Sequence, residues 1–456
     1  MLVADSLALQ GTVLTPTSPG YDDARTIWNA AIDRRPAVIA QCLGADDVAA
    51  SVCYARAHGL AISVRGGGHA ASGAAVVDDG LMVDLSRMKR VEVDPHARVA
   101  RVAPGVLLGE LDAATQEHGL AVPAGTVSHT GVAGLTLGGG IGWLQRKHGL
   151  TIDNLLEVEL VTADGEVVRA SADENDDLFW AVRGAGANFG VVTEFVFRLH
   201  KVGPLVTAGM LVFPFERAAE ILRCARDVLA DAPDELTTAL ALVTVPPHEP
   251  FPQELWGQKA VGIVPVYAGD LEAGASAVEP LRQLAEPALD LVGPMPYVAL
   301  QSMLDDTAPH GLHDYNAAET LADLDDGAIE AVLAAFAAVP SARSHVILTQ
   351  MGGASGRVEP TATAYAQRDA GWLAWVIGVW DPAEDDESNV AWVRVVRRAL
   401  EPFAAGGTYV NALEPEAGTT GRVAASYGAN WQRLVELKRQ WDPENVFRLN
   451  QNISPA

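Results

Sequence analysis

The chain has 456 residues, 49% of them hydrophobic, which indicates a globular protein of about two or three domains or one large two-lobed enzyme. Its 58 acidic and 32 basic residues give a formal net charge of -26, which disfavours nucleic acids and membranes as partners. No apolar run reaches the roughly 20 residues of a membrane span, and no basic region precedes the first apolar residues as in a signal peptide. The three cysteines have no metal-ligand spacing and fit free thiols. We therefore expect a cytoplasmic protein without a metal site.

The amino-terminal part of the chain is predicted to alternate helices with short strands. Apolar positions at helical spacing predict the first helix, with Asp46 as its cap and Gly59 at its end. Asp164-Gly165 between two β-branched segments is typical of a hairpin. The predicted helices are residues 46–58, 107–118 and 176–183, and the predicted strands are residues 60–64, 81–85, 91–93, 98–103, 155–162, 166–170 and 191–199.

A loop of three glycines ending on a histidine follows the first predicted strand, in residues 62–73 (ISVRGGGHAASG). Without Cβ atoms, Gly66, Gly67 and Gly68 allow consecutive N–H groups to turn toward one anion, as they do around a pyrophosphate. Arg65 adds a positive charge beside them. The neutral imidazole of His69 is nucleophilic enough to attack an activated carbon. Taken alone, the loop fits a glycine turn closed by a hydrogen-bonding histidine equally well.

A second glycine-rich stretch covers residues 124–143, with seven glycines in twenty residues. Such spacing lets the backbone lie against a flat or charged ligand at several points, although bulges in a closely packed sheet are the alternative. The stretch has no lysine-serine ending and no strand, GxGxxG and helix in sequence. It therefore argues against a Walker loop and against a nicotinamide-binding Rossmann site.

After Pro204, longer alanine-rich helices alternate with apolar strands, which indicates a second lobe of the α+β class. The predicted helices here are residues 216–230, 271–285, 329–339 and 390–400, and the predicted strands are residues 261–266, 345–351 and 373–379. The last fifty or so residues return to a dense polar and aromatic pattern.

Four stretches resemble, in order and spacing, the berberine-bridge-enzyme-like flavin oxidases of the vanillyl-alcohol-oxidase superfamily, and bacterial members above all. They are VRGGGHAASG, GTVSHTGVAGLTLGGGIGW with RKHGLTIDNL behind it, FWAVRGAGANFGVVTEF, and NWQRLVELKRQWDPENVFRLNQNISP. The resemblance implies an α+β, two-lobed flavoprotein. Residues 1–203 would form a p-cresol-methylhydroxylase-type FAD-binding domain, 204–403 a substrate domain with an antiparallel sheet, and 404–456 a segment that returns to the FAD domain.

The resemblance also implies FAD held covalently through His69 by a single link. Members with two links use a cysteine in the second glycine stretch, and here Val127 stands nearest its place. The positions that it assigns to cofactor binding are Arg65, Gly66, Gly67, Gly68, His69, Gly73, Gly131, Gly134, Gly138, Gly139, Gly142, Val192, Asn411, Asn450 and Asn452.

The flavin would accept a hydride, so a protein group must remove a proton. The resemblance points to a tyrosine just before an Arg-Leu pair, which makes Tyr427 the candidate base, with Ser426 competing for the position and packing as the alternative role for Tyr427. Other members carry a glutamate on a strand that reads HVILTQM here, without a carboxylate. His345, Thr349 and Gln350 from that strand, and Trp372, Trp375 and Trp380 from the next, either contact substrate or are structural.

The sequence thus predicts an FAD-dependent oxidase that acts on an alcohol or amine carbon of a small cyclic or aromatic molecule. Oxygen would reoxidise the flavin to give hydrogen peroxide, and the protein would be a monomer or homodimer. Two alternatives stay open: a flavin dehydrogenase that uses another electron acceptor, and a flavin-binding or ligand-binding protein without turnover.

Overall fold

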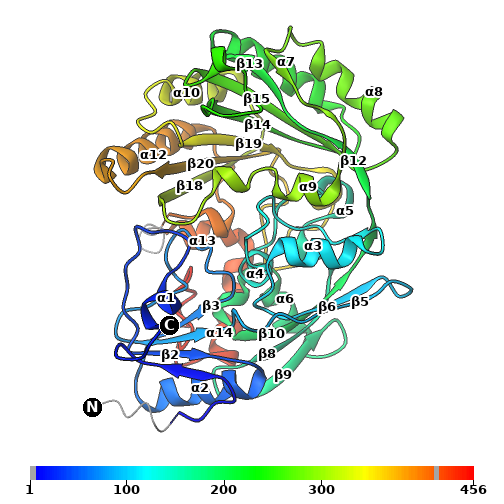
Figure 1. Cartoon of the computed structure of the whole chain (residues 1–456). Helices are drawn as coiled ribbons and strands as arrows, with labels where there is room; N and C mark the ends of the chain where they lie inside the picture. Colours follow the sequence, from blue (N-terminus) through cyan, green and yellow to red (C-terminus); the bar gives the residue numbers. More distant parts are fainter. Residues whose placement is uncertain (1–6, 415–420, 456) are drawn as a thin grey trace.

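A computed structural model describes residues 7–414 and 421–455 and shows two lobes, one above the other in Figure 1. The lower lobe is built from both ends of the chain, coloured blue through cyan to teal green and red, whereas the upper lobe comes from the middle, coloured green to orange. This arrangement confirms the predicted two-lobed α+β fold. No helix within the described residues is long and apolar enough to cross a membrane.

The lower lobe contains a four-stranded sheet in the order β1-β2-β4-β3, in which β2, β4 and β3 run parallel. Helix α2 (Ala45–Ala57) leads into β3, so the glycine loop leaves the carboxyl end of a strand. The structure corrects the predicted cap of α2: Gly44 precedes the helix, and the carboxylate of Asp47 instead accepts the N–H groups of Gln10, Gly11 and Leu43. The strands are β1 (Thr12–Leu14), β2 (Val38–Gln41), β3 (Ile62–Arg65) and β4 (Leu81–Asp84), and a short helix α1 (Tyr21–Arg25) precedes β2.

A second sheet of the lower lobe has five antiparallel strands in the order β5-β6-β10-β8-β9. The predicted hairpin is present as the pair of β8 and β9. The strands are β5 (Val91–Asp94), β6 (Val99–Val102), β8 (Leu155–Val161), β9 (Val167–Ser171) and β10 (Val191–Arg198), and the short strands β7 (Leu120–Ala121) and β11 (His200–Lys201) pair separately. The helices of this region are α3 (Leu108–Gln116), α4 (Val132–Leu137), α5 (Gln145–His148) and α6 (Asp176–Ala185).

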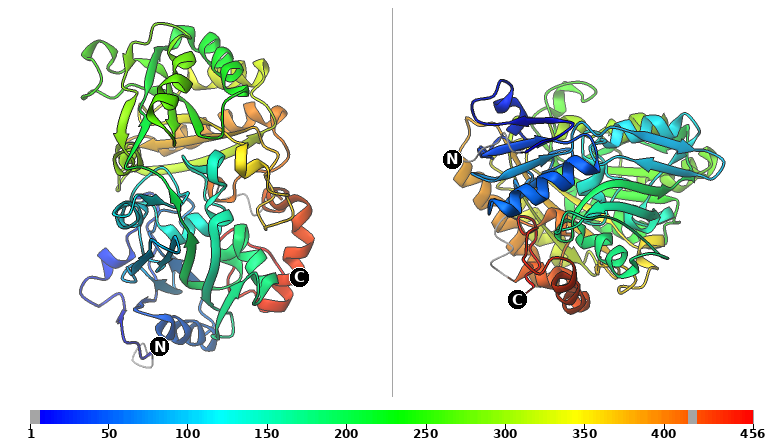
Figure 2. Two further views of the ribbon diagram at one scale, coloured as in Figure 1. Left: turned by 90° about the vertical axis from the view of Figure 1, so that its right-hand side faces the viewer. Right: turned by 90° about the horizontal axis from the view of Figure 1, so that it is seen from below.

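The carboxyl-terminal helices α13 (Arg422–Tyr427) and α14 (Trp431–Trp441) pack on the lower lobe, as both views of Figure 2 show. A fully buried ammonium group fixes this segment. Lys438 Nζ donates to the carboxylate of Asp442 and to the carbonyls of Asn188 and Phe447, each at 2.7 Å. A buried charge needs such complete pairing, and the pairing ties α14 to the loop that precedes β10.

The upper lobe is one antiparallel nine-stranded sheet, with the main path β16-β13-β15-β14-β19-β20-β18 and β12 and β17 at its side. Helices α7, α8, α10 and α12 cover its outer face (Figure 1), and the other face turns toward the lower lobe. The strands are β12 (Leu205–Ala208), β13 (Leu211–Pro214), β14 (Leu236–Thr244), β15 (Lys259–Tyr267), β16 (Leu289–Asp290), β17 (Gly293–Pro296), β18 (His313–Leu321), β19 (His345–Gln350) and β20 (Trp372–Trp380), and the helices are α7 (Ala218–Ala230), α8 (Leu271–Arg282), α9 (Tyr297–Ser302), α10 (Asp326–Phe336), α11 (Gly353–Gly356) and α12 (Asp386–Leu400).

The predicted helices and strands are all present to within a few residues, but the sequence analysis misses ten strands and seven helices. The missed strands are β1, β2, β7, β11, β12, β13, β14, β16, β17 and β18, and the missed helices are α1, α4, α5, α9, α11, α13 and α14. Strand β18 reads HDYNAAETL and lacks the apolar run or clean alternation that marks a strand. Its polar residues are nevertheless buried, Asp314 and Asn316 among them, which no local pattern reveals.

Candidate active site

A cavity of about 1290 Å³ lies between the two lobes. Its lower wall consists of the two glycine stretches, and its upper wall is the inward face of the large sheet. Polar contacts join the lobes at its edge: the N–H and hydroxyl groups of Ser128 both donate to the carboxylate of Asp305, at 2.8 and 2.6 Å. These bonds connect the lower and upper walls at this edge of the cavity.

The glycine loop after β3 forms one part of the lower wall. Gly66, Gly67, Gly68 and His69 all line the cavity. Among the described residues, no group accepts a hydrogen bond from the N–H groups of residues 66–72, which leaves these donors available to an anion. A Cβ on Gly67 would lie 2.5 Å from the N atom of Gly131, so glycine is required where the two glycine stretches meet.

The second glycine stretch continues this wall. Gly131, Gly134, Gly138 and Gly142 line the cavity, as do Val192 and Asn450. A Cβ on Gly134 would meet no atom within 4 Å, so its bare backbone borders open space. Asn411 also lines the cavity, and its amide donates to the carbonyls of Gly134 and Leu135 at 3.3 and 3.2 Å. Glycine backbone forms much of this wall, which suits a planar ring with a phosphate tail.

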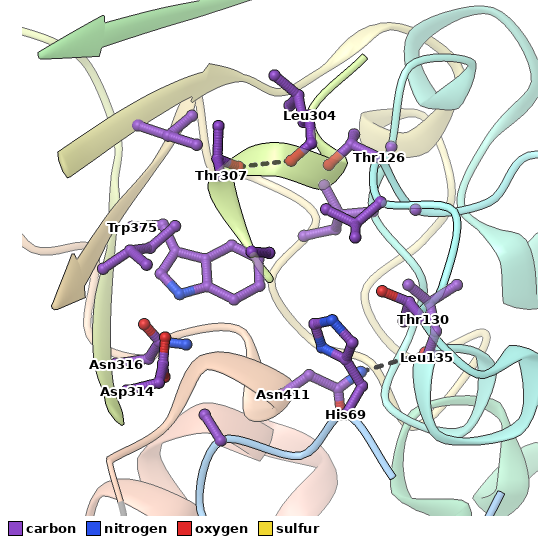
Figure 3. Close-up of a pocket in the computed structure, with 18 of the residues that line it drawn as sticks. His69, Thr126, Thr130, Leu135, Leu304, Thr307, Asp314, Asn316, Trp375 and Asn411 are labelled. Carbon is purple, nitrogen blue, oxygen red and sulfur yellow. Dashed lines mark hydrogen bonds between the residues drawn. The ribbon is translucent and has the colours of Figure 1, made fainter. Parts of the chain in front are cut away.

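His69 lies at the end of the first glycine loop, on the lower wall, and faces Trp375 of the upper wall across the cavity in Figure 3. Trp28 stacks on its imidazole, with 4.2 Å between ring centroids and an interplanar angle of 11°. The Nε2 atom is buried without a hydrogen-bond partner. Burial, and secondarily the neighbouring His129 and His310 imidazoles, lower the pKa of His69 to about 3. His69 is therefore neutral at physiological pH, with a lone pair free for bonding.

Four of the predicted cofactor positions lie outside the cavity wall, and Arg65 is the clearest correction. Its guanidinium donates to both carboxylate oxygens of the buried Asp84, at 3.0 and 2.6 Å, and to the carbonyl of Thr26. Because β3 and β4 are paired in register, Asp84 lies directly beside Arg65 and neutralises the charge that the sequence suggested for a pyrophosphate. The other three positions are Gly73, which forms a turn at φ +75°, Gly139, which packs on Tyr365, and Asn452.

The upper wall takes most of its side chains from alternate positions of paired strands of the large sheet. Ala239 and Ala241 come from β14, Thr349 and Ile347 from β19, and Trp375 from β20. His345 also lines the cavity, so of the predicted substrate contacts the structure brings His345, Thr349 and Trp375 to this wall. Gln350, Trp372 and Trp380 do not line it: Gln350 donates to the carbonyl of Leu229, and both tryptophans belong to the core on the helical side of the sheet.

Asp314 and Asn316 of β18 complete the upper wall and were missed in the sequence (Figure 3). Both are buried, and neither carboxylate oxygen of Asp314 has a hydrogen-bond partner among the described residues. Burial raises the pKa of Asp314 well above its usual range. Asp314 and Asn316 are two positions apart, so their side chains lie on the same face of the strand. This alternation was the one local sign of a shared polar face, and it is also typical of strands whose polar face is exposed.

Tyr427 also lines the cavity, but its surroundings argue against a role as general base. Its ring stacks near Trp431, at 6.2 Å between centroids, and its hydroxyl donates to the carbonyl of Gly184 at 3.4 Å. Burial raises the pKa of Tyr427, so the phenol keeps its proton at neutral pH. The competing Ser426 is occupied by the backbone, because its hydroxyl donates to the Arg422 carbonyl and accepts from the Thr408 N–H.

Comparisons with known proteins agree with this geometry. The family model of the FAD binding domain matches residues 36–171, and the model described as berberine and berberine like matches residues 408–454. The chain is 33% identical to (R)-6-hydroxynicotine oxidase of Paenarthrobacter nicotinovorans, over 99% of this chain and 98% of that protein.

Solved structures show the same likeness. The crystal structure of 6-hydroxy-D-nicotine oxidase from Arthrobacter nicotinovorans superposes with a TM-score of 0.89 at 30% identity, over the full length of both chains. Glucooligosaccharide oxidase from Acremonium strictum superposes with a TM-score of 0.86 at 25% identity, covering 98% of this chain and 97% of that one, and its FAD is described as 6-S-cysteinyl, 8α-N1-histidyl.

Proposed function

Because the chain belongs to the berberine-bridge-enzyme-like FAD-linked oxidoreductases, we propose that it is an oxidase of a small cyclic or aromatic alcohol or amine. FAD, when bound, accepts a hydride from the substrate carbon and passes two electrons to O2, which gives hydrogen peroxide. The observation that carries the proposal is the neutral imidazole of His69, whose buried Nε2 has no partner and which lines the cavity between the lobes.

The residues of the lower wall fit FAD in shape and in hydrogen bonding. The free N–H groups of residues 66–72 suit the pyrophosphate, and the bare backbone at Gly134 leaves room for a flat ring beside Asn411. Trp28 holds the imidazole of His69 in one orientation by stacking on it. We propose that His69 forms the covalent bond to the flavin, since the low pKa keeps its nucleophilic lone pair available.

We propose a single covalent link. None of the three cysteines, Cys42, Cys53 and Cys224, lines the cavity, and Val127 lines it near the place where a second link would form. We also propose that residues 1–203 and 404–456 form the FAD-binding part and residues 204–403 the substrate-binding part. The family models at 36–171 and 408–454, and a sheet whose strands run from Leu205 to Trp380, support this division.

The covalent link is tested by acid precipitation of the purified protein. The precipitate should stay yellow, and proteolysis should release one flavin-bearing peptide that contains His69. The variant His69→Ala should release its flavin to the supernatant. The control His58→Ala, which changes a histidine at the carboxyl end of α2 that does not line the cavity, should retain its flavin. Release of all flavin from the unmodified protein, or a flavin-bearing peptide containing a cysteine, would refute the assignment.

The reaction is tested by screening alcohols, amines and hydroxylated N-heterocycles for bleaching of the flavin absorbance under anaerobic conditions. An oxidase should then give about one hydrogen peroxide per substrate molecule when oxygen is admitted. Bleaching without peroxide indicates a dehydrogenase with another acceptor. No bleaching by any compound indicates a binding protein.

A further inference from the structure

The carboxyl group of Asp314 is an acidic feature of the upper wall that packing does not explain. The residue is 5% exposed, and both of its carboxylate oxygens are buried without a partner among the described residues. Buried carboxylates are normally paired or hydrogen-bonded, because an unpaired one loses its hydration without compensation. Figure 3 shows the side chain beside Asn316 and Trp375, across the cavity from His69.

The backbone of Asp314 is held in place from the other lobe. The side chain of Asn29 accepts a hydrogen bond from the Asp314 N–H at 3.1 Å and donates to its carbonyl at 2.9 Å. The same amide donates to the carbonyl of Ala71 at 2.8 Å, two residues after His69. Asn29 therefore fixes Asp314 relative to the loop that carries the proposed flavin link.

The groups around Asp314 offer it no cation, although the Nε1–H of Trp375, also buried without a partner among the described residues, is a neutral donor on the same wall. The Oδ1 atom of Asn316 is also buried and unpartnered, and the ring of Trp375 presents a π-system to the same space. The remaining titratable side chains lining the cavity are His69, His248, Glu249, Asp306, Arg343 and His345, together with Tyr409 and Tyr427.

None of these groups neutralises Asp314. Burial lowers the pKa of His345 and of His69, so both are uncharged at neutral pH. His248, Glu249, Asp306 and Arg343 are exposed, and burial raises the pKa of the two tyrosines. His313, the next residue along β18, is bonded to Asp386. Burial alone shifts the pKa of Asp314, upward, which favours the protonated carboxyl group, whereas a positively charged ligand beside it would favour the ionised form.

We propose that Asp314 binds the basic nitrogen of an amine substrate and accepts its proton. The proposal rests on the proposed function and narrows its substrate class from alcohols and amines to amines. The ammonium form docks on the carboxylate of Asp314, and the nitrogen passes one proton to a carboxylate oxygen. The nitrogen lone pair then forms a C=N bond with the adjacent carbon. At the same time the C–H bond of that carbon breaks, and the hydrogen leaves with both bonding electrons as a hydride, which the oxidised flavin accepts. The products are an iminium ion and a protonated Asp314.

A pair of inert probes tests this assignment in the flavin-loaded protein. Cumylamine and cumyl alcohol have the same shape and lack a hydrogen on the carbon next to the heteroatom, so neither can be oxidised. Only the amine is a cation at pH 7. Titration calorimetry in two buffers of different ionisation enthalpy gives both the affinity and the protons released on binding.

We expect the amine to bind about tenfold or more tightly than the alcohol, with release of close to one proton, because Asp314 ionises as the ammonium docks. Asp314→Asn is isosteric and should lose both the preference and the proton release. The control Asp306→Asn removes an exposed carboxylate at the same cavity and should keep both.

Equal affinity for the two probes overturns the proposal, as does binding of neither, or a preference and proton release that survive in Asp314→Asn. The flavin content of each variant is measured after acid precipitation in the same preparations. Loss of covalent flavin in the parent protein refutes the proposed function, whereas normal flavin with no amine preference refutes only the role of Asp314.

Discussion

Removing the side chain of Asn29 should weaken both the contact between the two lobes and the ordering of the loop that carries His69. Asn29 is 1% exposed and makes four hydrogen bonds, to Ala31, to Ala71 and to both backbone groups of Asp314. Ala31 is exposed, so water replaces its bond, whereas the other three partner groups are buried or partly buried. At about 1 kcal/mol for each group left unpaired, Asn29→Ala should lower the free energy of unfolding by about 3 kcal/mol.

The assay is urea unfolding of the apoprotein followed by tryptophan fluorescence, together with the covalent flavin content of protein expressed with FAD. Asn29→Ala should lower both, because the same amide orders the loop beyond His69. Asn29→Asp places a carboxylate oxygen against the carbonyls of Ala71 and Asp314, so it should be at least as unstable at pH 7. It should recover as the pH falls, since protonation restores one donor.

The matched control is Gln432→Ala on α14, whose exposed side chain makes one surface hydrogen bond to Glu436. Its stability should stay within about 0.5 kcal/mol of the parent. If Asn29→Ala unfolds within about 1 kcal/mol of the parent and keeps its full covalent flavin, the four hydrogen bonds do not hold the lobes together and the reasoning is refuted.

Three further substitutions test separate parts of the site. Asp314→Asn should stabilise the apoprotein at pH 8 and leave it unchanged near pH 3: because burial raises the folded-state pKa of Asp314 above its unfolded value, the parent loses stability as the pH rises through that pKa, and asparagine does not. Urea unfolding at the two pH values checks this, and equal shifts at both would contradict it. Gly67→Ala puts a Cβ 2.5 Å from the N atom of Gly131, so it should cost about 1–3 kcal/mol in stability and reduce the flavin absorbance of acid-precipitated protein. Tyr427→Phe removes only a long hydrogen bond to Gly184, so stopped-flow flavin reduction by an identified substrate should stay within a few-fold of the parent; slowing by about 100-fold or more would restore Tyr427 as the general base.

The glycine stretches could be read from the sequence because their requirement is local. Gly67 and Gly131 must be glycine because their backbones pass within van der Waals contact of each other. A run of glycines in a sequence has few other uses, so it indicates such a close approach. The same holds for the Asp164-Gly165 hairpin between β8 and β9. In both cases the residue type itself indicates the backbone conformation, so these close approaches and turns can be predicted from the sequence.

Arg65 shows where this reasoning fails. A cation beside a glycine loop can pair with the phosphate of a ligand or with a carboxylate of the protein, and the sequence alone does not distinguish these two partners for Arg65. The choice depends on the parallel pairing that sets Asp84 opposite Arg65, which is a property of strand register between segments 19 residues apart. The buried ion pair consumes the charge, so the anion-binding capacity of the loop comes from its N–H groups alone.

Asp314 shows the converse case, in which a residue that looks ordinary in the sequence acquires an unusual environment. An aspartate in a polar strand is normally exposed, and β18 has the polar composition of an edge strand. It becomes buried because its pairing with β20 directs alternate side chains toward the cavity, and because Asn29 meets it from 285 residues away. A carboxyl group kept there without a partner lowers the stability of the folded chain at neutral pH. A fold retains such a group at a cavity wall when a ligand supplies the missing charge, and for this reason the search for the substrate should begin with amines.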